Sequence, residues 1–154
     1  EATMRTLSIT LGIGLAIALA GCGETPQEEE EFCGDGVIVD SYTPGVSKFG
    51  GNGFEVVLQA TVPEPPSAGL NEWQIGIIDE LDNVRTDVTV VVQPTFTEDD
   101  FSPDPFPASL DGDSYVIGNL DLGDRTGPAD FDVSIEDPDT GNALDEVTFT
   151  FCIE

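Results

Sequence analysis

Apolar and polar residues alternate along most of the chain, and this period of two constrains the fold more than any other feature. Alternation of this kind is typical of a β-strand with one buried face and one wet face. In the first such segment Phe54, Val56 and Leu58 alternate with polar residues such as Glu55 and Gln59, so Val62 is predicted to be buried and Thr61 to face solvent. The pattern recurs in segments 54–62, 73–77, 88–92, 115–122, 131–135 and 147–151.

Turn-forming residues separate these segments. Gly, Pro, Asn and Asp gather at residues 50–53, 63–69, 82–83, 111–113 and 138–142. Short strands at such spacing are typical of an antiparallel sandwich. We therefore predict an all-β fold, an immunoglobulin-like antiparallel β-sandwich of about seven strands, with Trp73 in its core. The segments 95–108 and 123–128 break the pattern and are predicted to be loops, where function is commonly found.

The charge of the chain limits what it can bind. Its 154 residues include 31 acidic side chains, four Lys or Arg and no His, giving a formal charge of −27. Nucleic acid is excluded as a partner because phosphate binding needs Lys and Arg. Histidine-based catalysis and histidine-ligated metals are excluded because the chain has no His. Hydrophobic residues make up 39% of the chain, which is enough for the core of one domain.

The N-terminal segment predicts an export signal. An apolar run from Leu7 to Ala20 follows Met4 and Arg5. The run is shorter than the roughly 20 residues that a membrane-spanning helix needs. One positive charge, a short apolar stretch and then small residues are typical of a secretory signal peptide. Met4 is then the natural start, and residues 1–3 lie upstream of it.

The end of this run, Leu19-Ala20-Gly21-Cys22, resembles the lipobox of bacterial lipoproteins. The resemblance implies that Cys22 becomes the first mature residue and carries lipid, palmitate included; the alternative is an ordinary signal peptide with an incidental Cys. Several acyl chains would anchor the protein stably to a membrane. Gly23 stands where Asp would favour the inner membrane, so the outer membrane is expected. We predict a signal peptide over 1–21, an acidic flexible tether over 22–32 and the sandwich over 33–154.

Two further cysteines, Cys33 and Cys152, remain as a pair. Export to an oxidising compartment favours a disulfide between them. It would close a loop of about 120 residues, for which the chain-entropy estimate is about 5 kcal/mol at most. The alternative is a thiol pair for metal or redox chemistry, which no CxxC spacing supports.

A family resemblance covers about three-quarters of the chain. The features that carry it are Tyr42, Gly45 and Lys48, then Asn71-Glu72-Trp73 and Asp79, then Val88 to Pro94, Asp113-Ser114-Tyr115, Asn119-Leu120 and the closing FTFCIE of 149–154. In this order they resemble the YtkA-like domain, a small exported β-sandwich related to FixH-type proteins. The family is linked to copper handling and to the assembly of respiratory oxidases.

The chain departs from this family where copper would bind. The resemblance implies Met and His ligands after the Val-rich strand, which are soft and borderline donors suited to copper. Aligned from Pro94, the Met position is Phe96, the first His position is Asp99 and the second is Phe101. The second loop, 123–128, has no Met. We therefore expect the family's fold without copper as a cofactor.

Acidic residues in the two loops offer a different metal. Carboxylates are hard oxygen ligands, and Ca²⁺ takes six to eight oxygens. If the loops meet at one end of the sandwich, they could form a calcium site; the alternative is a solvated acidic surface. The candidate ligands are Glu98, Asp99, Asp100, Asp104 and Asp124. The stretch 137–142 superficially resembles an EF-hand loop, but a hairpin turn explains it better.

These observations predict a non-catalytic protein. No nucleophile motif or phosphate-binding loop is present, and nothing marks two carboxylates as a catalytic pair. We expect a lipid-anchored binding or accessory module of the bacterial cell envelope, facing the periplasm or the surface, with a protein partner there. The alternative is a calcium-dependent or structural surface module.

Overall fold

The computed structural model describes residues 31–33 and 36–154, and every regular element in them is a strand. The predicted signal peptide, Cys22 and most of the predicted tether lie outside these residues. Within the described ranges, no helix is long and apolar enough to cross a membrane. The strands are β1 (Glu31–Cys33), β2 (Val37–Val39), β3 (Val46–Phe49), β4 (Glu55–Val62), β5 (Leu70–Ile78), β6 (Thr89–Phe96), β7 (Phe106–Pro107), β8 (Ser109–Asp111), β9 (Ser114–Asp121), β10 (Gly127–Glu136) and β11 (Ala143–Ile153).

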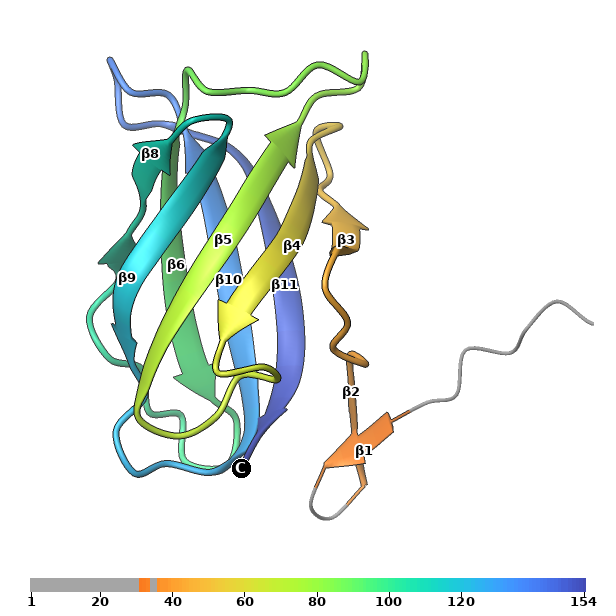
Figure 1. The fold of residues 1–154 in the computed structure, drawn as a ribbon, viewed down its shortest axis with the longest axis vertical. Coiled ribbons are helices and arrows are strands. Elements are labelled where there is room, and N and C mark those ends of the chain that lie inside the picture. Colours follow the sequence, from red (N-terminus) through yellow and green to blue (C-terminus); the bar gives the residue numbers. More distant parts are fainter. Residues whose placement is uncertain (1–30, 34–35) are drawn as a thin grey trace, which may run out of the picture.

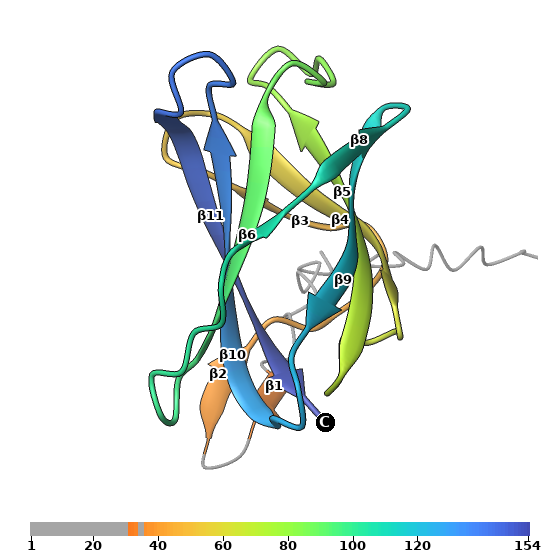
Figure 2. The same cartoon turned by 90° about the vertical axis from the view of Figure 1, so that its left-hand side faces the viewer.

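Two antiparallel sheets pack face to face (Figures 1 and 2). One has five strands in the order β3-β4-β5-β9-β8, and the other has four in the order β11-β10-β6-β7. The hairpin β1-β2 forms a separate two-stranded sheet beside them. The all-β sandwich is confirmed. The two sheets hold nine strands instead of about seven because β7 and β8 add edge strands of two and three residues.

The core lies between the sheets and is rich in aromatic side chains. Trp73 and Phe131 are both fully buried, and their ring centroids lie 4.7 Å apart across the two sheets. Phe151 meets Trp73 edge to face at 6.0 Å. The core position predicted for Trp73 is confirmed. Aromatic residues of this size contribute most of the buried apolar area of a small sandwich.

A β-bulge in β4 reverses one prediction. The register with β5 shifts between Leu58 and Ala60, where β4 carries one extra residue. An inserted residue moves every later side chain to the opposite face of the strand. Thr61 is therefore only 3% exposed while Val62 is 64% exposed. The simple alternation predicted the reverse, so that assignment was wrong for these two positions.

The acidic Pro-rich segment is more regular than the predicted loop 95–108. Strand β6 continues to Phe96, which is buried, and its amide donates to the Phe101 carbonyl at 2.8 Å. The Ser102 hydroxyl donates to the Pro94 carbonyl at 2.9 Å. The segment thus folds back over the edge of β6, which covers backbone groups that would otherwise be open to pairing. The second predicted loop is also shorter, because β10 begins at Gly127.

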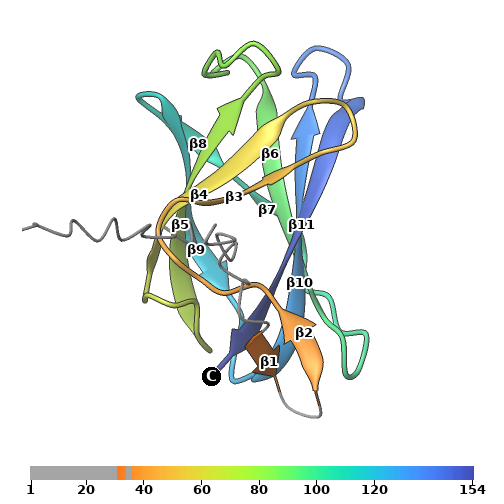
Figure 3. The same ribbon diagram turned by 90° about the vertical axis from the view of Figure 1, so that its right-hand side faces the viewer.

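The predicted disulfide between Cys33 and Cys152 is confirmed. Its Cα atoms lie 5.4 Å apart, and it joins β1 to β11 across 119 positions of sequence (Figure 3). Strand β1 starts at Glu31, two residues before the predicted start of the domain. Hydrogen bonds form a second link between the N-terminal segment and β11. The Asp40 carboxylate accepts from Lys48 at 2.6 Å and from the Thr150 amide at 2.7 Å. The segment before β3 is therefore clamped to the last strand.

Candidate functional site

The two loops singled out in the sequence meet at one end of the sandwich. They are the β6–β7 loop and the β9–β10 loop, at the lower end of Figure 2. The Thr97 amide and hydroxyl both donate to the Pro128 carbonyl, at 3.1 and 3.2 Å. The geometric condition for a shared site is therefore met, although the loops lie about 30 residues apart in sequence.

Arg125, in the β9–β10 loop, is the centre of this meeting point. The central carbon of its guanidinium group lies 3.6 Å from the ring centroid of Phe101 and 5.7 Å from that of Phe96. The same group forms an ion pair with the carboxylate of Asp99. A cation over an aromatic face is attracted by the ring quadrupole. Two rings and one carboxylate of the β6–β7 region therefore surround one cation of the other loop.

Hydrogen bonding keeps the Asp99 carboxylate charged. The Arg125 side chain donates to it and holds the pKa of Asp99 below its ordinary value of 3.8, against the opposing effect of desolvation. The Phe101 amide also donates to this carboxylate, at 3.3 Å. The Asp99 carboxylate is consequently charged near neutral pH.

The partners of Arg125 stand at the positions that the YtkA-like resemblance assigns to copper ligands. Phe96, Asp99 and Phe101 offer two phenyl rings and a hard oxygen in place of a thioether and two imidazoles. Copper prefers soft and borderline donors, so these residues do not fit it. A guanidinium group also remains charged at all physiological pH values, so a metal cation beside it would be repelled.

The other predicted calcium ligands do not converge on one point. Glu98 lines a pocket of about 340 Å³ together with Asp99 and Arg125. The other three, Asp100, Asp104 and Asp124, are exposed. In residues 31–33 and 36–154, no three acidic, His or Cys side chains are grouped so that they could hold a metal ion. A calcium ion would have to draw these carboxylates together, so the calcium site stays a prediction.

The stretch 137–142 is a hairpin turn between β10 and β11. The carboxylate of Asp137 accepts from the amides of Asp139 and Thr140, at 3.0 and 2.8 Å. These contacts, the Thr140 amide first, lower the pKa of Asp137. Gly141 has a φ of 68°, a conformation that favours glycine. The Asp137 carboxylate thus closes the turn. This agrees with the predicted hairpin turn, which was favoured over an EF-hand loop.

Arg125 was not among the candidate site residues predicted from the sequence. The loop 123–128 was identified only by its polar composition and its lack of Met. The available signal was the rarity of basic residues, because Arg125 is one of four in the chain and lies in one of the two candidate loops. Its partners could not be read from the sequence, since the ion pair with Asp99 joins residues 26 positions apart.

No protein-family model matches the chain, and no curated protein matches it. A solved structure, a copper-bound variant of FetP from uropathogenic Escherichia coli strain F11, is similar with a TM-score of 0.49 and 12% sequence identity. The similarity covers 73% of this chain and 96% of that chain. A likeness at this level does not transfer a metal or a function from one chain to the other.

Proposed function

We propose that this protein is a non-catalytic binding module of the bacterial cell envelope, anchored by lipid on Cys22, and that it engages a protein partner through the loop end around Arg125. It would be a diverged relative of the YtkA-like proteins that keeps the sandwich and has given up copper. The cluster of Arg125 with Phe96, Asp99 and Phe101 carries the proposal.

The exposure and chemistry of this cluster suit a protein partner. The Arg125 side chain is 37% exposed and Phe101 is 39% exposed, so both can be covered by another protein. Arginine and aromatic residues are the types that contribute most binding energy in protein interfaces. They project here from loops on a rigid scaffold, which is the usual placement of binding residues.

Among the described residues, no carboxyl group with a resolved pKa shift has the raised pKa of a general acid. Shifts are resolved for four carboxyl groups of the described residues, and in each the pKa is lowered by hydrogen bonds. A general acid needs a carboxyl group whose pKa is raised toward neutrality. The four residues, Asp79, Asp87, Asp99 and Asp137, are instead stabilised in their charged form.

Site-specific photocrosslinking in the native envelope tests the proposed interface. A photoreactive phenylalanine analogue replaces Phe101 in one version of the chain and Leu110 in another. Leu110 is a matched control, since it is exposed by 50% and lies on β8 in the other sheet. We expect a discrete crosslinked protein from position 101 that is absent from position 110 and is lost with Arg125→Ala. Identical products from both positions would contradict the proposal.

The lipid anchor is tested separately. Radiolabelled palmitate should be incorporated into the wild-type chain and not into Cys22→Ser, and the variant should leave the membrane fraction. Labelling that persists in Cys22→Ser would contradict the anchor while leaving the interface untouched.

A calcium-dependent surface module is the second candidate; Glu98 and Asp99 line one pocket, and calcium binding there would require Arg125 to leave Asp99. Binding to the folded state would raise the melting temperature by mass action. Calcium should then raise it more than magnesium does at constant ionic strength, and less so in Glu98→Gln. An equal response to both ions would reject this candidate.

A further inference from the structure

Four residues form a row across the outer face of the five-stranded sheet, here called the outer row. Phe49 in β3 is opposite Glu55 in β4, which is opposite Ile78 in β5. Ile78 in turn forms a β-bridge with Val84 in the β5–β6 connection. Residues opposite each other in a sheet point to the same face, with their Cβ atoms roughly 5 Å apart. That face is the outer one, because Val56, the neighbour of Glu55, is fully buried between the sheets.

The apolar side chains at the two ends of the outer row are exposed to solvent. Phe49 is 74% exposed and Val84 is 53% exposed. Val57, two positions after Glu55, adds a half-buried apolar side chain to the same face. Figure 1 shows the upper ends of β3, β4 and β5 at the front, with none of the described strands crossing over them. Single exposed apolar residues are common, but a group of them on one open face is typical of an interaction surface.

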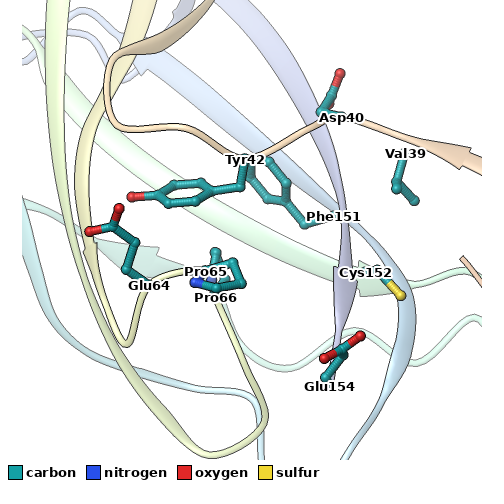
Figure 4. Close-up of a pocket in the computed structure, with 9 residues that line it drawn as sticks. All are labelled: Val39, Asp40, Tyr42, Glu64, Pro65, Pro66, Phe151, Cys152 and Glu154. Atoms are coloured by element: carbon teal, nitrogen blue, oxygen red, sulfur yellow. The ribbon is translucent and has the colours of Figure 1, made fainter. Parts of the chain in front are cut away.

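The chain covers two other parts of its surface with its own groups. On the outer face of the four-stranded sheet the Thr150 hydroxyl donates to the Asp130 carboxylate at 2.7 Å, so polar side chains satisfy each other there. Beside β11, the ring of Tyr42 packs edge to face on Phe151 at 5.9 Å (Figure 4). The exposure of Phe49 shows that the outer row has no comparable cover from the described residues.

Glu55 is the charged member of this otherwise apolar row. Its carboxylate accepts a hydrogen bond from the Ser47 hydroxyl at 2.6 Å, which holds the side chain on this face. It forms no ion pair in the part of the chain that the structure describes. The three basic side chains of that part, Lys48, Arg85 and Arg125, each pair with an aspartate instead. A fixed cation beside Glu55 would therefore belong to another molecule.

The charge of Glu55 decides what can cover this face. A wholly apolar partner or a lipid surface would bury the carboxylate without a counter-charge, which is strongly unfavourable. A second copy of the chain meets the same difficulty, because its own outer row offers no Lys or Arg. A surface that places one cation against Glu55 and apolar side chains on either side of it avoids this cost. The net charge of −27 also favours the approach of a cationic partner.

We propose that the outer row binds a segment of another protein in which one Arg or Lys is flanked by apolar side chains. The cation pairs with the Glu55 carboxylate, and the flanking side chains cover Phe49 on one side and Ile78 on the other. A charged pair enclosed by apolar contacts that exclude water is typical of the centre of a protein interface. This face lies at the opposite end of the sandwich from Arg125 (Figures 1 and 2). The proposal depends neither on the interface there nor on the lipid anchor.

Peptide binding followed by NMR tests the proposal. The complete chain is isotope-labelled, held in phosphatidylcholine nanodiscs and kept at constant ionic strength. It is titrated with the blocked peptide Leu-Val-Arg-Val-Leu and with a counterpart that has Gln in place of Arg. We expect saturable shifts at the amides of Phe49, Ile78 and Val84 with the Arg peptide. The Gln peptide should bind at least tenfold more weakly, as expected for the loss of one hydrogen bond to a charged group.

Variants separate a specific contact from general attraction to an acidic surface. Glu55→Gln should weaken binding of the Arg peptide to the level of the Gln peptide and leave the affinity for the Gln peptide unchanged. Phe49→Ser should weaken binding of both peptides. The matched control is Glu146→Gln, because Glu146 also accepts from a serine hydroxyl, that of Ser134 at 3.4 Å, but lies on the four-stranded sheet. This control should leave binding unchanged.

Three results would overturn the proposal. The first is equal affinity of the parent chain for the two peptides. The second is a loss of affinity in Glu146→Gln as large as that in Glu55→Gln, which would show attraction to acidic charge in general. The third is broadening of the Phe49 and Val84 signals by spin-labelled lipid in the absence of peptide, which would assign this face to the membrane.

Discussion

Removing the Cys33–Cys152 disulfide should lower the stability of the sandwich without abolishing its fold. The bond closes a loop with a sequence separation of 119, for which the chain-entropy estimate is about 5 kcal/mol. The loss should be smaller than this limit, because the bridge from Asp40 to Lys48 and Thr150 also ties the N-terminal segment to β11. We expect Cys33→Ala/Cys152→Ala to lose about 2–5 kcal/mol, the range typical of native disulfides.

Urea denaturation and calorimetry measure this loss directly. For a domain of this size, each kcal/mol corresponds to roughly 4 °C, so the melting temperature should fall by about 8–20 °C. The single variant Cys22→Ala is the control, and it should leave the unfolding transition unchanged. A double variant within about 1 kcal/mol of the parent would refute the reasoning, as would a loss of all strand signal in far-ultraviolet circular dichroism.

Four further predictions follow from side-chain contacts. Asp145→Ala should cost about 2–3 kcal/mol in urea unfolding, because the buried carboxylate accepts from the amides of Asn52 and Phe54. Gly50→Ala should also destabilise the fold, since a Cβ there would lie 2.3 Å from the Asp145 carboxylate; combined with Asp145→Ala its cost should shrink, and full additivity would argue against the contact. Phe131→Ala should cost about 3–5 kcal/mol by thermal unfolding, because it empties the space beside Trp73; a cost under 1 kcal/mol would place Phe131 outside the core. The lowered pKa of Asp137 should add stability that is present above its ordinary value of 3.8 and is lost as the pH falls below it. Urea midpoints measured through this acid range should therefore drop less steeply in Asp137→Asn than in the parent, and parallel profiles would contradict the prediction.

The strands were predictable because burial imposes a period of two on the sequence. Ile75, Val90 and Val133 each follow that rule and are fully buried. The reversal at Thr61 and Val62 was not predictable, since a one-residue bulge leaves no mark in composition. Short edge strands such as β7 were not predicted for a related reason, because two residues are too few to show a period.

The candidate site was predictable only in part. The resemblance directed attention to Phe96, Asp99 and Phe101, and the structure brings all three around one point. The residue that fills this point, Arg125, belongs to another loop. Its placement depends on how the β6–β7 and β9–β10 connections meet after the sheets have packed, and local sequence does not encode that meeting.

Copper affinity tests most directly whether an internal cation has replaced the metal. The chain, Arg125→Ala and the quadruple variant F96M/D99H/F101H/R125A are titrated with Cu(I) against a coloured chelator. We expect the parent and Arg125→Ala to leave copper with the chelator, because phenyl and carboxylate groups are poor Cu(I) donors. The quadruple variant should withdraw it. Withdrawal of copper by the parent chain would contradict the account.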